Sequence, residues 1–262
     1  MRFGLIGCGG IGQLRAEALK KLPEAELTIV CDIDPSLVEE MVRKFGAKKA
    51  KDWQALVSEE NLDAVIVSTP PHLHAEMCIA ALDAGKHVLC EKPLAKNISE
   101  CQDMVATAKT TGCFLATGFN YRFYPSMIKA RQLLDSGIIG PLDHIRSYAG
   151  YSAREHGQEW LHDEKIMGGG ALRDNGIHLI DLTCYFLNDV TEVKGFSSNS
   201  VWQFPGCEDN GFALIRNRRG SVAILQASWN EWRGYRMLVE IYGKLGCIRA
   251  YCFPMFVQVI WS

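Results

Sequence analysis

The sequence predicts an α/β fold in which a doubly wound parallel sheet comes first and an α+β domain follows. Up to about residue 120, apolar strand-like runs alternate with amphipathic helical stretches, as they do in βαβ units. A glycine-rich turn follows the first of these runs. Beyond that point most predicted strands follow one another through short turns that contain glycine, which favours an antiparallel or mixed sheet.

The first half opens with a strand at 2–6 and a helix at 13–22, whose apolar stripe is predicted at Leu14, Ala18 and Leu22. The continuous apolar run 62–70 is typical of a strand that is buried on both faces. The elements predicted in this half, besides the first two, are a strand at 26–32, a helix at 36–46, the strand at 62–70, a helix at 72–86, a strand at 87–93, a helix at 99–112 and a strand at 113–120.

The second half is predicted to hold two helices and a run of strands. The helices are expected at 127–137 and, behind a glycine run, at 168–187 as one long helix. The strands are expected at 142–152, 191–203, 211–217, 220–230, 236–243 and 246–252. We therefore expect two domains, 1–119 with the doubly wound sheet and 120–262 with the α+β fold.

Composition excludes several classes of protein. Lys+Arg 28 against Asp+Glu 30 leaves a formal charge of −2, which gives no support to a nucleic-acid-binding protein. No apolar stretch approaches the length of about 20 residues that crosses a bilayer, so no membrane partner is expected. The 10 cysteines include no CxxC pair, and no secretory leader precedes the first strand. These features favour reduced thiols and a cytoplasmic location.

The turn after the first strand carries the spacing of a dinucleotide-binding fingerprint. Gly7 would allow the tight turn, Gly9 the close approach of a pyrophosphate, and Gly12 the close packing of helix on strand. Amide groups at the start of the helix, including those of Gly10 and Ile11, would hold the pyrophosphate. A glycine turn in a non-binding α/β fold is the alternative.

Asp32 lies 20 residues beyond Gly12, at the end of the second predicted strand. That is the expected position of the carboxylate that binds the adenosine ribose hydroxyls. A carboxylate there would repel a 2′-phosphate, and no Arg or Lys occurs among residues 33–36. The sequence therefore predicts NAD as the cofactor in preference to NADP.

Lys92 stands between Glu91 and Pro93 at the end of a predicted strand. Ligands of a doubly wound sheet bind at the carboxyl ends of its strands, so Lys92 is a candidate for stabilising a developing alkoxide. Pro93 keeps Lys92 out of helical geometry, and the bond between them is a candidate for the cis form. A solvated lysine before a loop is the alternative.

Asp174, His178 and Asp181 share one face of the predicted helix because of their i, i+4, i+7 spacing. An acid paired with a histidine suits an oriented general base. A polar helix edge, or a histidine buried in the core, is the structural alternative. A zinc or manganese site that also uses His162 and Asp163 is a further reading, which we rank below the acid–base one.

Other polar and aromatic residues are weaker candidates. His72 and His74 follow a Pro-Pro pair at the end of a strand, where we expect helix-start polarity near a cofactor rather than a metal site. Tyr121, Tyr124 and Trp160 are candidates for lining a pocket, although aromatic residues more often belong to a core.

Together these residues resemble the Gfo/Idh/MocA family of oxidoreductases, named for glucose–fructose oxidoreductase and inositol dehydrogenase. The matching segments are GLIGCGGIG, VIVSTPPHLHAEMCIAALDAGKHVLCEKPLA, GFNYRFYP and GGGALRDNGIHLIDL. The resemblance implies an N-terminal Rossmann domain followed by a domain with a large, mostly antiparallel sheet. It also implies oxidation of a carbinol, or reduction of a carbonyl, on a sugar, nucleotide sugar, inositol or related polyol, with NAD or NADP.

The resemblance also implies roles for individual residues. Lys92 matches the lysine of the family's EKP motif, and Asp174 and His178 match its paired acid and histidine, so these three become the expected catalytic residues. Asp181 matches a further acid of that helix face. The residues implied at the cofactor, besides the glycine turn, Ile11 and Asp32, are Ser68, Thr69, Pro70, His74, Glu91 and Lys92. Those implied at the substrate are Asn120, Arg122 and Trp160.

The expected mechanism has His178, oriented by Asp174, take a proton as hydride moves to NAD, while Lys92 stabilises the alkoxide. Whether Lys92 or His178 is the formal base stays open. The specific substrate also stays open, and Arg154, His156, Trp160 and His162 are candidates for its selection. A catalytically silent NAD-binding sensor or scaffold is the rival reading, and a metal-dependent hydrolase is a weaker one.

Two expectations concern the end of the chain and assembly. Members of the family commonly pair through the open face of the C-terminal sheet, which implies a homo-oligomer. They also usually continue for several tens of residues beyond this sheet, so the chain resembles a member that is short at its C-terminus. The run FVQVIW at 256–261 is then expected to be an exposed apolar strand.

Overall fold

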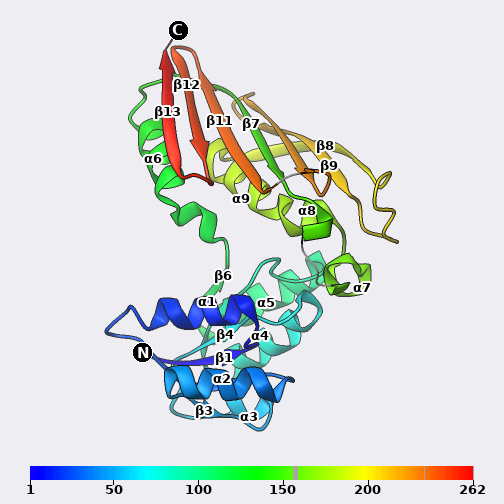
Figure 1. The fold of residues 1–262 in the computed structure, drawn as a ribbon. Coiled ribbons are helices and arrows are strands. Elements are labelled where there is room, and N and C mark those ends of the chain that lie inside the picture. Colours follow the sequence, from blue (N-terminus) through cyan, green and yellow to red (C-terminus); the bar gives the residue numbers. More distant parts are fainter. Residues whose placement is uncertain (156–158, 233, 262) are drawn as a thin grey trace. The chain divides into compact units, whose positions relative to one another are not determined.

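The structure is a computed structural model that describes residues 1–155, 159–232 and 234–261. The chain forms two compact units, Met1–Gly118 and Phe119–Ser262, and Figure 1 shows the elements of each.

The first unit is a six-stranded sheet, every strand of which runs parallel to its neighbours, in the order β3-β2-β1-β4-β5-β6. This is the strand order of a doubly wound dinucleotide-binding fold. Its elements are β1 Arg2–Ile6, α1 Gly10–Leu19, β2 Glu26–Cys31, α2 Pro35–Phe45, β3 Lys48–Lys49, α3 Trp53–Val57, β4 Ala64–Val67, the 3₁₀ turn η1 Pro71–Leu73, α4 His74–Asp83, β5 His87–Cys90, α5 Ile98–Thr111 and β6 Leu115–Thr117.

Helices cover both faces of this sheet, which explains the apolar strands. All four residues of β4 are buried, as expected for a strand without a solvent face. Helix α2 begins where the Asp34 carboxylate accepts a hydrogen bond from the Ser36 amide, and it ends at Gly46 with φ +73°.

The apolar stripe predicted for α1 at Leu14, Ala18 and Leu22 is wrong. The helix ends at Leu19 and buries Gly12, Ala16 and Leu19, because its inner face is set by close packing at Gly12.

The second unit holds a seven-stranded sheet in the order β13-β12-β11-β7-β10-β9-β8. Its elements are η2 Asn120–Phe123, α6 Pro125–Asp135, β7 Leu142–Gly150, η3 Ala153–Glu155, η4 Glu159–His162, α7 Glu164–Met167, α8 Ala171–Asp174, α9 Gly176–Leu187, β8 Val190–Ser198, β9 Asn210–Asn217, β10 Val222–Ser228, β11 Arg236–Gly243, β12 Gly246–Tyr251 and β13 Phe256–Trp261. Only β7 and β10 pair in parallel, and the other pairs are antiparallel. The predicted fold class is confirmed for both units.

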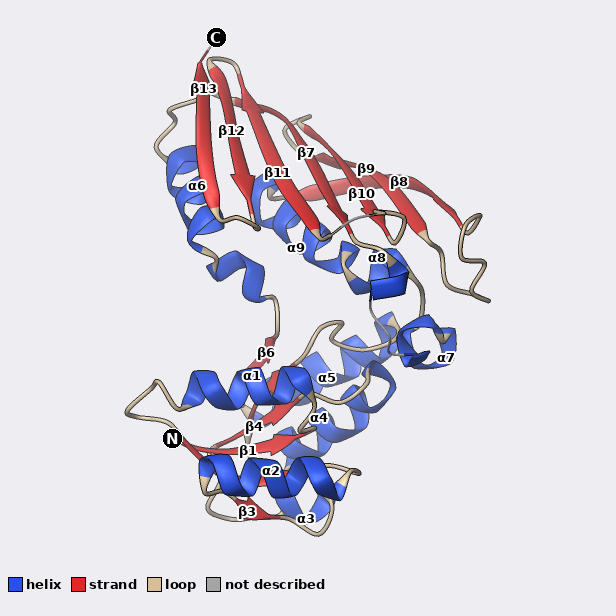
Figure 2. Ribbon diagram, viewed as in Figure 1, coloured by secondary structure: helices blue, strands red, loops and turns tan. Residues whose placement is uncertain are grey.

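Helices α6 and α9 lie against one face of this sheet (Figure 2). A Cβ atom at Gly176 would lie 2.6 Å from the Cβ of Ala227 on β10, so the glycine lets the start of α9 pack closely on the sheet. The core between helices and sheet includes the fully buried Leu179, Leu182, Leu225 and Val239. This face fixes where α8 and α9, which carry the candidate catalytic acid and histidine, lie on the sheet.

The opposite face of the sheet carries large apolar side chains at its surface. The register places Phe196 of β8 beside Phe212 of β9, and Leu214 of β9 beside Ile224 of β10. Their exposed fractions are 85% for Phe196, 42% for Phe212, 51% for Leu214 and 48% for Ile224. Strand β13 is an edge strand, and its Trp261 is 58% exposed, as the sequence predicts for FVQVIW. We call the face with these four apolar side chains the open sheet face.

Two features of this unit differ from expectation. The long helix predicted at 168–187 is divided at Asn175 into α8 and α9. The Asn175 side chain donates to the Ser228 carbonyl oxygen of β10, a tertiary contact that helical periodicity does not reveal. The short helices η4 and α7 also lie in a stretch that the sequence leaves as a loop. Within the described ranges, no helix is long and apolar enough to cross a membrane.

Candidate active site

The glycine turn connects β1 to α1 and is shaped by glycines at two crowded positions. Gly7 has φ +95°, and a Cβ atom there would lie 2.7 Å from the carbonyl carbon of Ser68. A Cβ atom at Gly12 would overlap the carbonyl oxygen of Gly7. Only glycine satisfies both requirements, because an L side chain rarely adopts such a φ and has no room at either place. The turn therefore has the geometry that the fingerprint predicts.

Space beside the turn suits a dinucleotide pyrophosphate. A Cβ atom at Gly9 or at Gly10 would have no neighbour within 4 Å, so a ligand can approach this backbone closely. No side chain caps the first turn of α1, and such uncapped amides at a helix start attract anions. Ser68 Oγ, at the end of the neighbouring strand β4, is buried and has no hydrogen-bond partner within the described chain. The residues present thus fit the expected NAD.

Asp32 lies directly after β2 and is half-buried. Its Oδ2 atom accepts a hydrogen bond from the Cys8 amide at 2.6 Å, and its Oδ1 atom accepts one from the Asp34 amide at 2.9 Å. The carboxylate is therefore oriented beside the glycine turn, where its remaining lone pairs suit ribose hydroxyls. Burial, together with the negative charge of Asp32, raises the pKa of the Cys8 thiol to about 12. Cys8 consequently stays protonated.

Lys92 is half-buried in the loop after β5, and the Lys92–Pro93 peptide bond is cis. The preceding Glu91 is buried, and its Oε1 atom pairs with Arg15 of α1, with both nitrogen contacts at 2.5 Å. Glu91 is expected at the cofactor, but it also has a structural role. Its ion pair with Arg15 connects the loop of Lys92 to α1, the helix that follows the glycine turn.

His74, also expected at the cofactor, is fully buried at the start of α4. Its Nδ1 atom lies 2.9 Å from the Pro93 carbonyl oxygen, and its Nε2 atom lies 2.8 Å from the Thr69 carbonyl oxygen. Both ring nitrogens thus face the main chain. Thr69 itself points its hydroxyl at the Met77 sulfur, at 3.7 Å, and Pro70 leads into η1.

Asp174 ends the short helix α8 and is buried, with 7% of its surface exposed. Its Oδ2 atom accepts hydrogen bonds from the Tyr151 hydroxyl and, at 3.1 Å, from the Trp229 indole nitrogen. Burial and the charge of Asp174 raise the pKa of Tyr151 far above its ordinary value, so this hydroxyl remains a donor. Two buried donors on one oxygen hold the carboxylate in a single orientation.

The glycine run before α8 is held by Glu208. Its two carboxylate oxygens accept hydrogen bonds from the amides of Gly170 and Leu172, each at 2.8 Å. These are amides of the first helical turn, which would otherwise have no acceptor. A Cβ atom at Gly170 would overlap the Glu208 main chain. Glu208 therefore fixes the start of the helix that carries Asp174.

His178 lies in the first turn of α9 and is buried. Its ring stacks on the Tyr121 ring, with centroids 4.1 Å apart and planes at 7°, and meets Phe119 edge-on at 6.2 Å. The Tyr121 hydroxyl in turn lies 3.0 Å from the Tyr235 hydroxyl. These aromatic contacts fix the plane of the imidazole, which is what a directed proton transfer requires.

Arg122, which the resemblance implies at the substrate, pairs with Asp181, the further acid of the α9 face. The Arg122 guanidinium donates to both carboxylate oxygens of Asp181, at 2.7 and 2.6 Å. This fork raises the pKa of Arg122 above its ordinary value. It ties η2 to α9 and favours an anchoring use of both side chains. The nearby Asn120 side chain donates to the Tyr124 hydroxyl at 3.4 Å.

The residues expected to select the substrate lie in a stretch, 154–162, that the structure describes only in part. Trp160 lies in η4 and is half-buried, and His162 stacks on Phe204 with ring centroids 4.0 Å apart. The Arg154 guanidinium lies 5.4 Å from the centre of the Trp202 ring. His156 lies outside the described residues. Within the described ranges, no three His, Cys, Asp or Glu side chains are grouped as a metal site requires.

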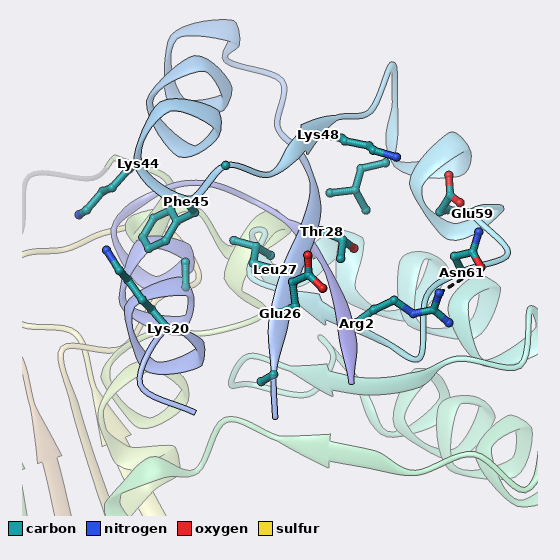
Figure 3. Close-up of a pocket in the computed structure, with 14 residues that line it drawn as sticks. Arg2, Lys20, Glu26, Leu27, Thr28, Lys44, Phe45, Lys48, Glu59 and Asn61 are labelled. Atoms are coloured by element: carbon teal, nitrogen blue, oxygen red, sulfur yellow. Dashed lines mark hydrogen bonds between the residues drawn. The ribbon is translucent and has the colours of Figure 1, made fainter. Parts of the chain in front are cut away.

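A hollow of about 670 Å³ lies elsewhere in the first unit (Figure 3). It is bordered by the start of β2 and the end of α2, and Lys20, Lys44 and Glu26 are among the residues that line it. The start of β2 lies at the amino ends of the parallel strands, whereas the glycine turn follows the carboxyl end of β1. None of the expected site residues lines this hollow, so it does not belong to the candidate site.

Sequence reasoning missed three residues that support the site, namely Tyr151, Glu208 and Trp229. It marks Tyr121 as a candidate for lining a pocket, without its stacking on His178. The hydrogen bonds of the three missed residues to α8 join positions 23 to 55 residues apart. No local pattern marks such partners. Only the glycine run gave a signal, because three adjacent glycines indicate a close backbone approach.

Comparison with known proteins gives consistent matches along the chain. Residues 1–119 match the family described as "Oxidoreductase family, NAD-binding Rossmann fold", and residues 127–249 match "GFO/IDH/MocA C-terminal domain". Myo-inositol 2-dehydrogenase of Thermotoga maritima is 32% identical over an alignment of 256 residues, and the match covers 95% of this chain and 75% of that protein. A dTDP-3,4-didehydro-2,6-dideoxy-α-D-glucose 3-reductase of Actinomadura kijaniata is 32% identical over 94% of this chain and 73% of its own length.

Solved structures agree with this. A levoglucosan dehydrogenase in complex with NADH is 26% identical and superposes with a TM-score of 0.91, covering 100% of this chain and 80% of the other. GenD2 from gentamicin A biosynthesis, in complex with NAD, is 26% identical with a TM-score of 0.90, covering 96% of this chain and 72% of the other.

Proposed function

The chain belongs to the Gfo/Idh/MocA family of NAD-binding oxidoreductases, and on that premise we propose how it acts. The proposed reaction is hydride transfer between NAD and a secondary carbinol, or the matching carbonyl, of a sugar, nucleotide sugar, inositol or related polyol. The main support is that the glycine turn, Lys92 and the oriented acid of α8 all occur in one chain of this family.

NAD supplies the hydride acceptor in this proposal. The amides of the glycine turn and of Gly10 and Ile11 bind its pyrophosphate, and Asp32 binds the adenosine ribose. Ser68 Oγ, with the neighbouring Thr69 and Pro70, contributes from the end of β4. The negative charge of Asp32 favours NAD over NADP.

Lys92 carries the charge-stabilising role. Its ammonium group donates a hydrogen bond to the substrate oxygen and stabilises the negative charge that grows there as the C–H bond breaks. Glu91 serves this role indirectly, because its ion pair with Arg15 holds the strand end next to Lys92.

His178 takes the proton of the substrate hydroxyl, and Asp174 stabilises the imidazolium that results. The support is geometric. Asp174 is held by Tyr151 and Trp229, and the His178 ring is held by Tyr121. Asn120, Arg122 and Trp160 are proposed near the substrate, with Arg122 acting through its pair with Asp181.

The test is NADH formation over a panel of inositols, sugars, sugar anhydrides and nucleotide sugars. Lys92→Ala and His178→Ala are expected to lower kcat by about a hundredfold or more, with the Kd for NAD changed little. Lys109→Ala is the matched control, because its side chain is exposed and Lys109 is not among the residues proposed to bind the cofactor or the substrate. Unchanged turnover in both site variants refutes the roles. NAD binding without turnover on any substrate favours a sensor or scaffold.

The open sheet face supports a homo-oligomer. Its exposed apolar side chains form neighbouring pairs across β8, β9 and β10, and patches of this kind mark contact surfaces. Replacing Phe196 and Leu214 with Glu is expected to yield monomers by light scattering, while the wild type gives a larger mass. A monomeric wild type at high concentration rules this interface out.

The cysteines support a cytoplasmic location. All ten lie in described positions and carry free thiols, as expected in a reducing compartment such as the cytoplasm. Fractionation of cells that produce the protein tests this location.

The two domains are proposed as 1–119 for the cofactor and 120–262 for substrate and assembly.

A further inference from the structure

His74 is a buried titratable group that the proposed reaction does not use directly. It begins α4, directly after the turn that follows β4, yet it reaches the loop that follows the adjacent strand β5. Its exposed fraction is 0%, and both ring nitrogens face carbonyl oxygens. The ring therefore spans the ends of two neighbouring strands at the carboxyl edge of the sheet, where doubly wound folds bind their ligands.

The two carbonyl contacts are not equivalent. A neutral imidazole has one N–H and donates to one acceptor only, whereas an imidazolium donates to two. Burial lowers the pKa of His74, although the main chain at Thr69, Pro93 and Leu94 and the nearby Glu91 carboxylate act in the opposite direction. The ring thus carries one N–H at neutral pH, and that proton has to be assigned to one nitrogen.

Burial decides the assignment. The contact between Nδ1 and the Pro93 oxygen is buried, while the contact between Nε2 and the Thr69 oxygen is partly buried. Leaving a buried carbonyl oxygen without a donor costs more free energy than leaving a partly buried one, because water cannot replace the missing hydrogen bond. The favoured tautomer therefore carries its proton on Nδ1 and donates to Pro93.

A bond to Pro93 acts on Lys92. The pyrrolidine ring fixes φ of Pro93, so an anchored Pro93 carbonyl restricts the peptide that joins it to Lys92. Glu91, on the other side of Lys92, is anchored through Arg15. Lys92 thus sits between two held residues, although its own side chain is only half-buried.

We propose that His74 is a positioning residue for Lys92, acting through an Nδ1–H hydrogen bond to the Pro93 carbonyl rather than by contact with the cofactor. This inference rests on the proposed role of Lys92. In this proposal the His74 side chain connects the loop that follows β4 to the loop that follows β5.

Two substitutions separate a donor at Nδ1 from a donor at Nε2. The Asn amide nitrogen falls close to the position of Nδ1, and the Gln amide nitrogen falls close to that of Nε2. His74→Asn keeps the bond to Pro93, His74→Gln moves the donor to Thr69, and His74→Leu removes both. Asp83→Asn is the matched control, since Asp83 is exposed and lies at the other end of α4.

Kinetics of the full chain give the first readout. His74→Asn is expected to keep kcat within about threefold of wild type, whereas His74→Gln and His74→Leu lower it about tenfold. The Kd for NAD, measured by calorimetry, changes less than kcat in all three variants. The proposal is overturned if His74→Gln keeps kcat, if His74→Asn loses as much as His74→Leu, or if kcat and NAD affinity fall together.

Hydrogen exchange of the ligand-free protein gives a readout that needs no turnover. Amides of residues 94–96 are expected to exchange about tenfold faster in the Gln and Leu variants than in wild type, and at the wild-type rate in His74→Asn. Equal exchange in all variants overturns the proposal. If Lys92→Ala leaves turnover unchanged, the proposed function fails instead, and exchange still decides whether His74 holds this loop.

Discussion

Tyr151→Phe tests how the buried carboxylate of Asp174 is held. The substitution removes one hydroxyl and leaves the ring, in a place where Tyr151 is 3% exposed and Asp174 is 7% exposed. A hydrogen bond to a charged group contributes about 1.5–3 kcal/mol. Trp229 still donates to the same oxygen, so the carboxylate is not left without a donor. We expect a loss of about 2 kcal/mol in the free energy of unfolding.

The assay is urea unfolding followed by tryptophan fluorescence, in a cycle with Asp174→Asn. Tyr151→Phe is expected to cost about 2 kcal/mol in the wild-type background and clearly less beside Asp174→Asn, because the charge that strengthens the bond is gone. Tyr148→Phe is the control. Its hydroxyl donates to Glu231 at 2.6 Å on a partly exposed surface, where we expect a loss below about 1 kcal/mol. Equal losses for Tyr151→Phe in both backgrounds would refute the reasoning.

The remaining predictions concern the cofactor and pH. Gly9→Ala keeps the stability of the fold but weakens NAD binding in calorimetry, since its Cβ enters open space beside the turn, whereas Gly12→Ala also lowers Tm because its Cβ overlaps the Gly7 oxygen. The ratio of kcat/KM for NAD to that for NADP is expected to be about a hundredfold, from the charge of Asp32; comparable values contradict this. Burial lowers the pKa of His74, so the unfolded chain binds its proton first and stability falls as pH drops from about 7 to 5. His74→Asn should lose less stability than wild type over that window in urea titrations.

The sequence predicts the first unit well because its signals are local. Continuous apolar runs identify buried parallel strands, and glycines such as Gly46 end helices by a backbone requirement. The α1 stripe fails because burial there follows Gly12, a residue without a side chain, rather than apolar periodicity. The helix division at Asn175 fails for another reason, since a side-chain bond to Ser228 on a distant strand overrides local helical preference.

The residues of the candidate site also fall into those that the sequence predicts and those that it does not. Spacing alone points to Gly7, Gly12 and Asp32, because backbone approach and strand ends set their positions. It cannot reveal that Tyr151 and Trp229 hold Asp174, since partners on other elements are chosen by tertiary packing. Nor does a histidine near a strand end disclose that both its ring nitrogens face main-chain carbonyls.

The hydrogen bond from the Cys8 amide to Asp32 constrains how the nucleotide preference of this chain can change. The carboxylate that disfavours a 2′-phosphate is also an anchor of the glycine turn. A substitution that removes it admits the phosphate and, in the same step, deprives a partly buried amide of its acceptor at about 1–3 kcal/mol. A single substitution at Asp32 that changes the preference to NADP therefore also destabilises the glycine turn, which binds either nucleotide. A successful redesign needs a small polar residue such as Ser or Asn, able to accept from that amide, together with a new cation nearby.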